Sequence, residues 1–524
     1  MVLLCYFFCK NFFQKVTCLC LTFFVPLQDE RLKHNRNMNK SELKPAVVFE
    51  QFAKINQIPR PSKREEKMIE YLKNFGESHG LETKVDEVGN VLIRKPATKG
   101  FEDCKTVILQ SHMDMVCDSL PEVQVDFDKD AIQAYVDGEW MRAKGTTLGA
   151  DDGIGCAMEL AILESNDIEH GPIECVFTRD EETGLTGAFG MKADFMTGDF
   201  LINLDSEDEG EIFVSCAGGR TTTATMDIQR EAAPEGFFFI KGSVKGLVGG
   251  HSGDDINKKR ANGLKIIARF VYQEMERYPE ARLVRLHGGS LHNAIPRGGY
   301  FVLAVPAALK ENIRADWNVF SAQVDEEFHV TDTQMVWRMR SYDPEPVIEA
   351  EKARRFVYAL QAIDNGVYSV CQDEALGGMT ETSSNLARVE TNADNIEIFT
   401  SQRSNVMSNL DNMCNTIAAC LKLAGFNVVH SEGYPAWKMR TNSELQKIVA
   451  YTYHKLFQKN PVVRGIHAGL ECGLFAERYP QLDMVSFGPT LRDVHTPDER
   501  LLISTVEMVW DHLLLTLKSI PHKM

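Results

Sequence analysis

A set of acidic and histidine side chains is dispersed along the chain, and each follows a short apolar run. The set comprises His112, Asp114, Asp151, Glu181, Glu182, Asp205 and His495. Apolar runs such as residues 107–109 and 200–202 indicate buried strands, and in open α/β sheets the edge where strands end binds ligands. Two imidazoles and several carboxylates in one crevice would leave much negative charge unbalanced. A pair of divalent metals is the simplest compensation.

Several of these positions have an ordinary explanation as well as a chemical one. His112 and Asp114 are two residues apart, so both project to the same side if the strand continues. An aspartate there can accept the second ring N–H of a metal-bound histidine, although an H-x-D tripeptide also occurs by chance. Asp151 precedes a glycine-rich helix start, where it either caps the helix or bridges two metals. Its neighbour Asp152 is the better candidate for the cap.

The acidic pair Glu181 and Glu182 directly follows a predicted buried strand. Because neighbouring carboxylates diverge, one can bind a metal while the other is the general base for a metal-bound water. A solvated acidic loop is the alternative. Asp205 and His495 also follow apolar strands and would complete the coordination of two metals. Strand-end placement and adjacent glycines favour the metal interpretation of the whole set.

The segments around these residues alternate between strand and helix patterns. Helices are predicted over residues 62–80 and 153–165, and strands over residues 82–88, 90–94, 106–110, 173–178 and 200–204. This alternation is typical of a doubly wound α/β domain, here one with a mostly parallel sheet. That domain would hold the dispersed set at the ends of its strands.

The pattern changes near residue 218 and returns after residue 434. The intervening segment predicts an inserted α+β lid domain, with strands over residues 221–226, 237–244, 300–305 and 396–400 and helices over residues 264–275, 317–326 and 347–362. Beyond it we predict a helix over 444–457, a strand over 482–487 and a closing helix over 506–517. The catalytic domain is therefore expected in two parts, residues 38–217 and 435–524, on either side of a lid at 218–434.

Composition narrows the class of protein. With 44% hydrophobic and 25% charged residues, the 524-residue chain has the composition of a soluble globular protein of two or more domains. Its formal net charge of −17 argues against a nucleic-acid or anionic-membrane partner. The 13 cysteines form no C-x-x-C pair or other framework, which is typical of reduced cytoplasmic thiols.

The first 37 residues differ from the rest, because they are strongly apolar but interrupted by Lys10 and Lys15. The longest apolar run, residues 16–27, is shorter than the roughly 20 residues of a membrane-spanning helix. A signal-peptide core is an alternative, although no small-residue cleavage site follows. We expect instead that translation starts at Met38, which opens a polar lead into an amphipathic helix.

Eight motifs together resemble the M20 metallopeptidases. They are SHMDM, LGADDGIG, EETG, INLDSEDEGEI, GGHSG, HNAIPR, HAGLECGLF and GPTLRDVHTPDE. The similarity extends from about Met38 to the C-terminus. Relatives often carry Asn where Asp152 stands, a change that affects no ligand.

The resemblance assigns a role to each member of the set. His112 and Asp205 would bind one metal, Glu182 and His495 the other, and Asp151 would bridge the two. Glu181 would be the general base, and Asp114 would orient His112.

The resemblance also implies contributions from the lid and its surroundings. His251 in GGHSG would stabilise the oxyanion that develops on the scissile carbonyl. Asn293, Arg403 and His467 would hold the substrate, and the Arg403 guanidinium suits a C-terminal carboxylate because it can pair bidentately. Without the resemblance, His251 would be interpreted as a turn histidine and Arg403 as a surface ion-pair partner.

The implied activity is that of a cytoplasmic, homodimeric dipeptidase that hydrolyses Xaa-His and other dipeptides through a metal-bridged water. Imidazole and carboxylate ligands suit Zn²⁺, and also Co²⁺ or Mn²⁺. The alternatives within the family are a tripeptidase, an aminoacylase or a carboxypeptidase. A non-catalytic peptide-binding module of the same fold is the alternative from a different class, and the retention of every ligand and of the base argues against it.

Overall fold

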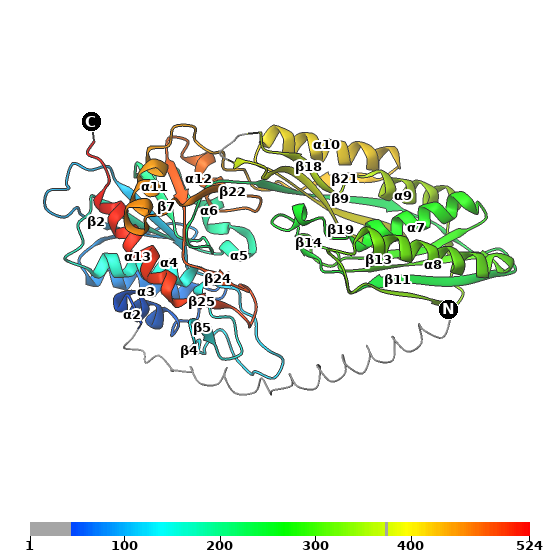
Figure 1. Ribbon diagram of the computed structural model, residues 1–524, viewed down its shortest axis with the longest axis horizontal. Coiled ribbons are helices and arrows are strands. Elements are labelled where there is room, and N and C mark those ends of the chain that lie inside the picture. Colours follow the sequence, from blue (N-terminus) through cyan, green and yellow to red (C-terminus); the bar gives the residue numbers. More distant parts are fainter. Residues whose placement is uncertain (1–42, 373–375, 524) are drawn as a thin grey trace, which may run out of the picture.

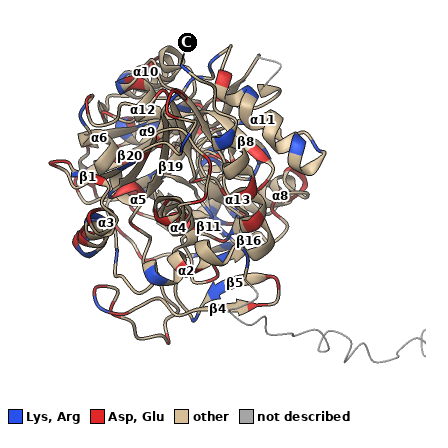
Figure 2. Cartoon of the chain, turned by 90° about the vertical axis from the view of Figure 1, so that its left-hand side faces the viewer, with Lys and Arg blue, Asp and Glu red and all other residues tan. Residues whose placement is uncertain are grey.

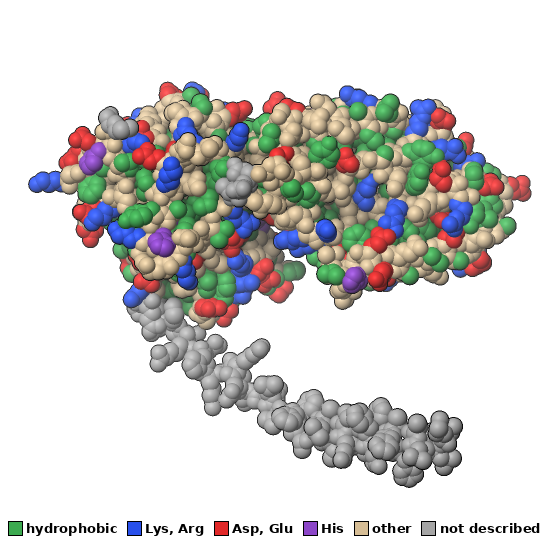
Figure 3. Space-filling view, turned by 45° about the horizontal axis from the view of Figure 1, so that its top comes forward, with side chains coloured by type: hydrophobic (Ala, Val, Ile, Leu, Met, Phe, Trp, Pro, Cys, Tyr) green, Lys and Arg blue, Asp and Glu red, His purple; other side chains and the backbone are tan. Residues whose placement is uncertain are grey.

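The computed structural model describes residues 43–372 and 376–523, which form two lobes along the long axis of the molecule (Figure 1). The expectations for the apolar segment 1–37 and for a start at Met38 lie outside the described residues. The space-filling view shows the lobes meeting at a narrower waist (Figure 3). On the end face of the first lobe, acidic and basic side chains are interspersed rather than segregated (Figure 2).

The first lobe contains an eight-stranded sheet. In spatial order its strands are β1 (Glu82–Val85), β2 (Val91–Lys95), β6 (Ile173–Thr178), β3 (Val107–His112), β7 (Phe200–Asn203), β23 (Asp483–Ser486), β8 (Glu211–Cys216) and β22 (Val462–Ile466). The four central strands β6, β3, β7 and β23 are parallel, whereas β1, β2 and the β23–β8 pair are antiparallel. The sheet is therefore mixed, with the expected parallel arrangement at its centre.

Helices cover both faces of this sheet, as a doubly wound fold requires. They are α2 (Ala46–Ile55), α3 (Glu66–Ser78), α4 (Ala150–Glu164), α5 (Glu181–Gly184), α6 (Thr186–Gly190), α11 (Glu444–Phe457), α12 (Cys472–Arg478) and α13 (Ile503–Lys518). Successive residues of β3 belong to cores on opposite faces: Leu109 packs with α4 and α13, and Ile108 with α6 and α12. This two-sided burial explains why residues 107–109 of β3 are consecutive apolar residues.

A small four-stranded sheet lies beside α13 and consists of β24 (Leu491–Arg492), β25 (Arg500–Leu502), β5 (Trp140–Ala143) and β4 (Ala134–Asp137). The chain segment 493–499, which contains His495, connects β24 to β25. Antiparallel pairing of these strands therefore anchors the last histidine of the set on both sides.

The second lobe is built on a nine-stranded sheet. Its strands in spatial order are β16 (Val336–Ser341), β11 (Phe237–Lys245), β15 (Gly299–Pro306), β13 (Arg282–Gly288), β19 (Thr380–Thr391), β20 (Asn395–Ser404), β9 (Gly218–Asp227) and β21 (Asn427–His430), and β18 (Gly366–Val370) pairs with β19. All of these pairings are antiparallel. Short ladders join β10 (Arg230–Glu231) to β17 (Val347–Ile348), and β12 (Gly250–His251) to β14 (Ala294–Ile295).

The helices of the second lobe gather on one face of its sheet (Figure 1). They are α7 (Gly263–Arg277), α8 (Lys310–Glu327), α9 (Ala350–Ala362) and α10 (Met407–Leu423), with short 3₁₀ turns η2 (Ile256–Lys258) and η3 (Ala307–Leu309). The helix predicted over 347–362 begins only at Ala350, because Val347 and Ile348 pair with β10 as a strand. Among the described helices, none combines the length and apolar character needed to cross a membrane.

Candidate metal centre and substrate cleft

The dispersed acidic and histidine set converges at one edge of the first sheet. His112 ends β3, Glu181 begins α5 directly after β6, and Asp205 follows the end of β7. Because β6, β3 and β7 are parallel, their C-terminal ends meet at the same edge. His495 reaches this edge from the loop between β24 and β25.

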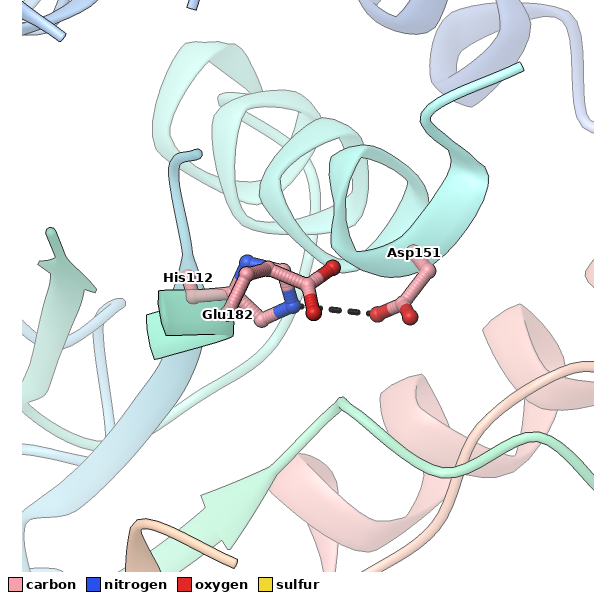
Figure 4. Close-up of side chains that lie close together, drawn as sticks. All are labelled: His112, Asp151 and Glu182. Atoms are coloured by element: carbon pink, nitrogen blue, oxygen red, sulfur yellow. Dashed lines mark hydrogen bonds and ion pairs between the residues drawn. The ribbon is translucent and has the colours of Figure 1, made fainter. Parts of the chain in front are cut away.

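Asp151 lies between the two histidines. Its Oδ1 is 3.0 Å from His112 Nε2 (Figure 4), and its Oδ2 is 3.0 Å from His495 Nε2. On one side, Asp205 Oδ1 is 3.5 Å from His112 Nε2, and on the other, Glu182 Oε2 is 3.0 Å from His495 Nε2. The side chains thus form two groups of donors that share one carboxylate.

The backbone departs from helical geometry at the start of α4, where it presents Asp151 to the two histidines. Asp151 and Asp152 have non-helical backbone angles, and the Asp152 carboxylate accepts a hydrogen bond from the Gly155 N–H at 3.1 Å. As expected, Asp152 serves as the helix cap. Glu499, which the sequence analysis did not select, accepts hydrogen bonds from the backbone N–H groups of residues 148–151. Its carboxylate holds the loop that presents Asp151.

Asp114 connects the His112 ring to the acidic pair. Its Oδ1 lies 3.4 Å from His112 Nδ1 and accepts the Glu181 N–H at 3.0 Å. Its Oδ2 accepts the Glu182 N–H at 3.3 Å and the Ser62 hydroxyl at 2.8 Å. One buried carboxylate therefore orients the imidazole and fixes the backbone of the residues beside it.

We expect Asp114→Ala to weaken the binding of divalent metal ions by about 10–100-fold, the usual effect of losing a carboxylate that orients a ligand histidine. The variant also loses both N–H contacts to the acidic pair. Calorimetric titration of the metal-free variant with Zn²⁺ measures the change. Ser62→Ala is the matched control, because it removes only one hydrogen bond to Asp114. Equal affinities in Asp114→Ala and the unmodified protein would contradict the orienting role.

Burial in this crowded site shifts the pKa of its titratable groups. Desolvation, reinforced by Asp151, raises the pKa of Asp205 to about 7. Desolvation lowers the pKa of His495, but hydrogen bonds to Asp151 and Glu182 outweigh it and raise that pKa to about 11. The pKa of His112 also lies well above its usual value, because Asp205, Asp114 and Asp151 outweigh desolvation. The carboxylates of the site thus strongly favour positive charge on the groups that lie between them.

The donor set fits divalent metal ions. Ligand atoms of His112, Asp151 and Glu182 lie within 4.8 Å of one another. Glu182 Oε1 is buried and has no hydrogen-bond partner among the described residues. Imidazole nitrogens and carboxylate oxygens in such groups are ligands for Zn²⁺ and related ions. A cation would satisfy the unpaired oxygen and balance the excess negative charge.

A second carboxylate missed by the sequence analysis lies beneath the site. Glu471 is 1% exposed, and its Oε2 accepts hydrogen bonds from Gln110 and Thr178, near the ends of β3 and β6. Desolvation raises the pKa of Glu471 to about 8, and Asp205 and Asp114 add to the rise. Desolvation, Asp205, Glu182 and Glu471 likewise raise the pKa of Glu181 well above its usual value. The acid in HAGLECG was the available signal, but only its neighbour His467 had been selected.

Groups from the second lobe face this site. His251 lies on β12. Its Nδ1 is 3.5 Å from Asp254 Oδ2, and its Nε2 is 3.3 Å from Arg403 Nη2. Arg403 on β20 is only 6% exposed. Its Nη1 donates a hydrogen bond to the Tyr434 hydroxyl at 2.6 Å. No carboxylate of a described residue lies within 4.0 Å of this guanidinium, which leaves a nearly buried cation without an ion-pair partner.

His467 and Asn293 differ in their surroundings. His467 is buried, and its Nε2 lies 2.7 Å from the Ser383 hydroxyl on β19, so it joins the two lobes. Desolvation and the nearby Arg403 lower the pKa of His467 to about 3. Asn293 adjoins His251 through its carbonyl, which accepts the Ser252 N–H at 2.7 Å. The Asn293 side chain is exposed and makes no hydrogen bond to a described residue.

Comparisons with known proteins relate the whole chain to one family. The model of Peptidase family M20/M25/M40 matches residues 108–518. The cytosol non-specific dipeptidase of Escherichia coli K12 is 41% identical over 484 residues, which cover 92% of this chain and 99% of the relative. The crystal structure of aminoacylhistidine dipeptidase from Vibrio alginolyticus, also 41% identical, superposes with a TM-score of 0.82 over 93% of this chain and 99% of that one.

An aminopeptidase from Bacillus cereus shares the fold at 17% identity, with a TM-score of 0.54 over 92% of this chain and 99% of the other. The family model spans both strand-end histidines and the second lobe between them. With the family match and the 41% identity extending over nearly the full length of a relative, the chain belongs to peptidase family M20, a family of metal-dependent peptidases.

Proposed function

We propose that this protein is a dipeptidase that hydrolyses Xaa-His and other dipeptides with the help of two divalent metal ions. The observation that carries the proposal is the position of Asp151, with one oxygen 3.0 Å from each of two histidines on opposite sides. Two relatives match this chain over nearly their full length, a non-specific dipeptidase and an aminoacylhistidine dipeptidase. Their names support dipeptides as the substrate class.

The proposed ligands follow the two groups of donors. His112 and Asp205 would hold one ion, Glu182 and His495 the other, and Asp151 both. Zn²⁺ is the proposed metal because its preferred ligands are these imidazoles and carboxylates, and Co²⁺ or Mn²⁺ could replace it.

When bound, the ions would lower the pKa of water and polarise the scissile carbonyl. Glu181 would take the proton of the attacking water on its carboxylate and deliver it to the leaving nitrogen. His251 would donate a hydrogen bond from its ring to the oxygen on which negative charge develops. Asp114 would hold the Glu181 backbone and the His112 ring in position during these steps.

The substrate would be held from the second lobe. The nearly buried Arg403, which lacks a carboxylate partner among the described residues, would pair with the C-terminal carboxylate of the dipeptide. His467 and Asn293 would contact the substrate backbone. An anchor at a fixed distance from the reacting bond favours a short substrate of one length.

Three further points belong to the proposal. The second lobe would be a lid at residues 218–434, since β9 to β21 form its sheet, and the catalytic domain would comprise 38–217 and 435–524. A cytoplasmic location is supported by the name of the E. coli relative. A homodimer is the assembly implied by family resemblance, and light scattering would measure it.

A substrate panel on the Zn²⁺-loaded enzyme tests this function. We expect kcat/KM for Xaa-His and other dipeptides to exceed the values for tripeptides, N-acyl amino acids and C-terminally extended peptides by about 100-fold or more, as a dipeptidase requires, and the Arg403 anchor would itself exclude peptides with more than one residue after the reacting bond. Enzyme treated with a chelator is the blank. Faster hydrolysis of tripeptides or N-acyl amino acids would assign the protein to another activity of the family. Full metal loading without turnover of any substrate would favour a binding module.

A further inference from the structure

Tyr434 occupies the place where the chain returns from the second lobe to the first. It follows β21, and its backbone is paired with Gly219 at the start of β9, where the chain had entered that lobe. The Gly219 N–H donates to the Tyr434 carbonyl at 3.1 Å, and the Tyr434 N–H donates to the Gly219 carbonyl at 3.0 Å. The two crossings between the lobes therefore fix the Tyr434 backbone.

Two glycines make room for the Tyr434 ring. A Cβ atom on Gly219 would lie 2.4 Å from the Tyr434 hydroxyl oxygen, and one on Gly469 would lie 2.6 Å from ring atom Cε2. Both distances are far below van der Waals contact, so a side chain at either position would displace the ring. The absence of side chains at these positions allows the phenol to take the orientation seen here.

That orientation directs the phenol oxygen at Arg403. The Tyr434 hydroxyl accepts a 2.6 Å hydrogen bond from Nη1, while Nη2 faces His251. Arg403 is itself paired with Gly219 across β20 and β9, so its backbone and its guanidinium are anchored on the same crossing. Because the hydroxyl is used as an acceptor, its own hydrogen remains available for donation to another group.

Charged groups from both lobes influence the pKa of the Tyr434 phenol. Desolvation raises the pKa of Tyr434, and besides Cys216 the carboxylates of Asp254 and Glu181 add to the rise, against the lowering effect of Arg403. Glu181 belongs to the first lobe and Asp254 to the loop after His251. Carboxylates of both lobes therefore influence the phenol, whose hydroxyl contacts Arg403.

We propose that Tyr434 is a positioning residue that fixes the Arg403 guanidinium for the C-terminal carboxylate of the substrate and thereby sets the preference for a free carboxylate over a carboxamide. This inference rests on the proposed function, which supplies the Arg403 anchor. An arginine side chain has several rotatable bonds, and a hydrogen bond to a rigidly held phenol removes that freedom before the substrate binds.

The test compares Tyr434→Phe and Arg403→Ala on a dipeptide and on the same dipeptide with a C-terminal amide. We expect Tyr434→Phe to raise KM for the free acid by about tenfold, the effect of one hydrogen bond to a charged group, with kcat changed by less than about threefold. The preference for the acid over the amide should fall by the same factor. In Arg403→Ala the preference should disappear.

Tyr453→Phe is the matched control, since it removes a hydroxyl that donates to Glu209 within the first lobe and does not contact Arg403, and it should keep the preference. Gly469→Ala displaces the Tyr434 ring without removing its hydroxyl and should also reduce the preference, which covers the case that Tyr434→Phe fails to fold. If Arg403→Ala loses the preference while both ring variants retain it, the role of Tyr434 is refuted and the anchor stands. If Arg403→Ala retains the preference, the anchor and the role of Tyr434 both fall.

Discussion

Glu181→Gln should lower kcat for dipeptide hydrolysis by about 10³-fold while leaving the metal content of the protein unchanged. Glutamine keeps the size of the side chain and its backbone N–H contact to Asp114, but it cannot take up the proton of the attacking water. The ligand groups around His112 and His495 do not include this carboxylate. Steady-state kinetics and metal analysis of the same preparation measure the two quantities.

Glu159→Gln is the matched control. This glutamate on α4 is fully buried, accepts a hydrogen bond from Ser111 and has a pKa that desolvation raises well above its usual value; glutamine keeps its size and can accept the same hydrogen bond. We expect its kcat to remain within about threefold of the unmodified enzyme. Two outcomes contradict the assignment of Glu181: near-normal turnover in Glu181→Gln, or a loss of turnover that accompanies a loss of metal.

The position of the site could be predicted from the sequence because the strands that carry it are buried on both faces. In β3, residues 107–109 are all apolar for that reason, and the polar residues from Gln110 to His112 follow at the end of the strand. The ends of β6 and β7 follow the same rule. The division of the side chains into two groups about Asp151 is a different matter, because nothing in their spacing specifies it and it came from the resemblance to a family.

The second lobe was only partly predictable. Strand β19 was not expected, since its sequence is rich in Ser and Thr and lacks the apolar alternation of a strand with one buried face. Its side chains Ser383 and Asn385 are nevertheless buried, because that part of the strand faces the cleft and other loops instead of a hydrocarbon core. Helix α10 was likewise missed.

The sequence does not show which residues support the site through distant contacts, even where a motif such as HAGLECG contains one of them. Glu499 accepts hydrogen bonds from backbone N–H groups some 350 residues earlier in the chain, and any acidic residue could have been chosen for that role. Glu471 and Tyr434 similarly depend on partners brought together only by the tertiary fold. The type of a residue indicates which hydrogen bonds it can form. Whether it forms them depends on the partner that the tertiary fold places beside it.

Asp151→Ala should lower the number of bound metal ions per chain from two to one or fewer and reduce kcat/KM by more than about 10³-fold. Loss of a residue that merely orients a ligand costs about 10–100-fold in metal affinity, and among the described residues Asp151 is the one carboxylate placed against both histidines. The measurement is metal stoichiometry after dialysis, together with the increase in thermal stability that added Zn²⁺ produces, which depends on binding and not on catalysis.

His495→Ala is the informative comparison for Asp151→Ala, because it removes a donor from one group only. We expect it to keep close to one ion per chain, bound by His112, Asp151 and Asp205, and to show a smaller but measurable stabilisation by Zn²⁺. Asp152→Asn, a change at the neighbouring helix cap, should retain both ions, since its carboxylate bonds to Gly155 and not to the histidines. If Asp151→Ala binds two ions as tightly as the unmodified protein, the bridging assignment is wrong, and the two groups of donors must bind metal independently of each other.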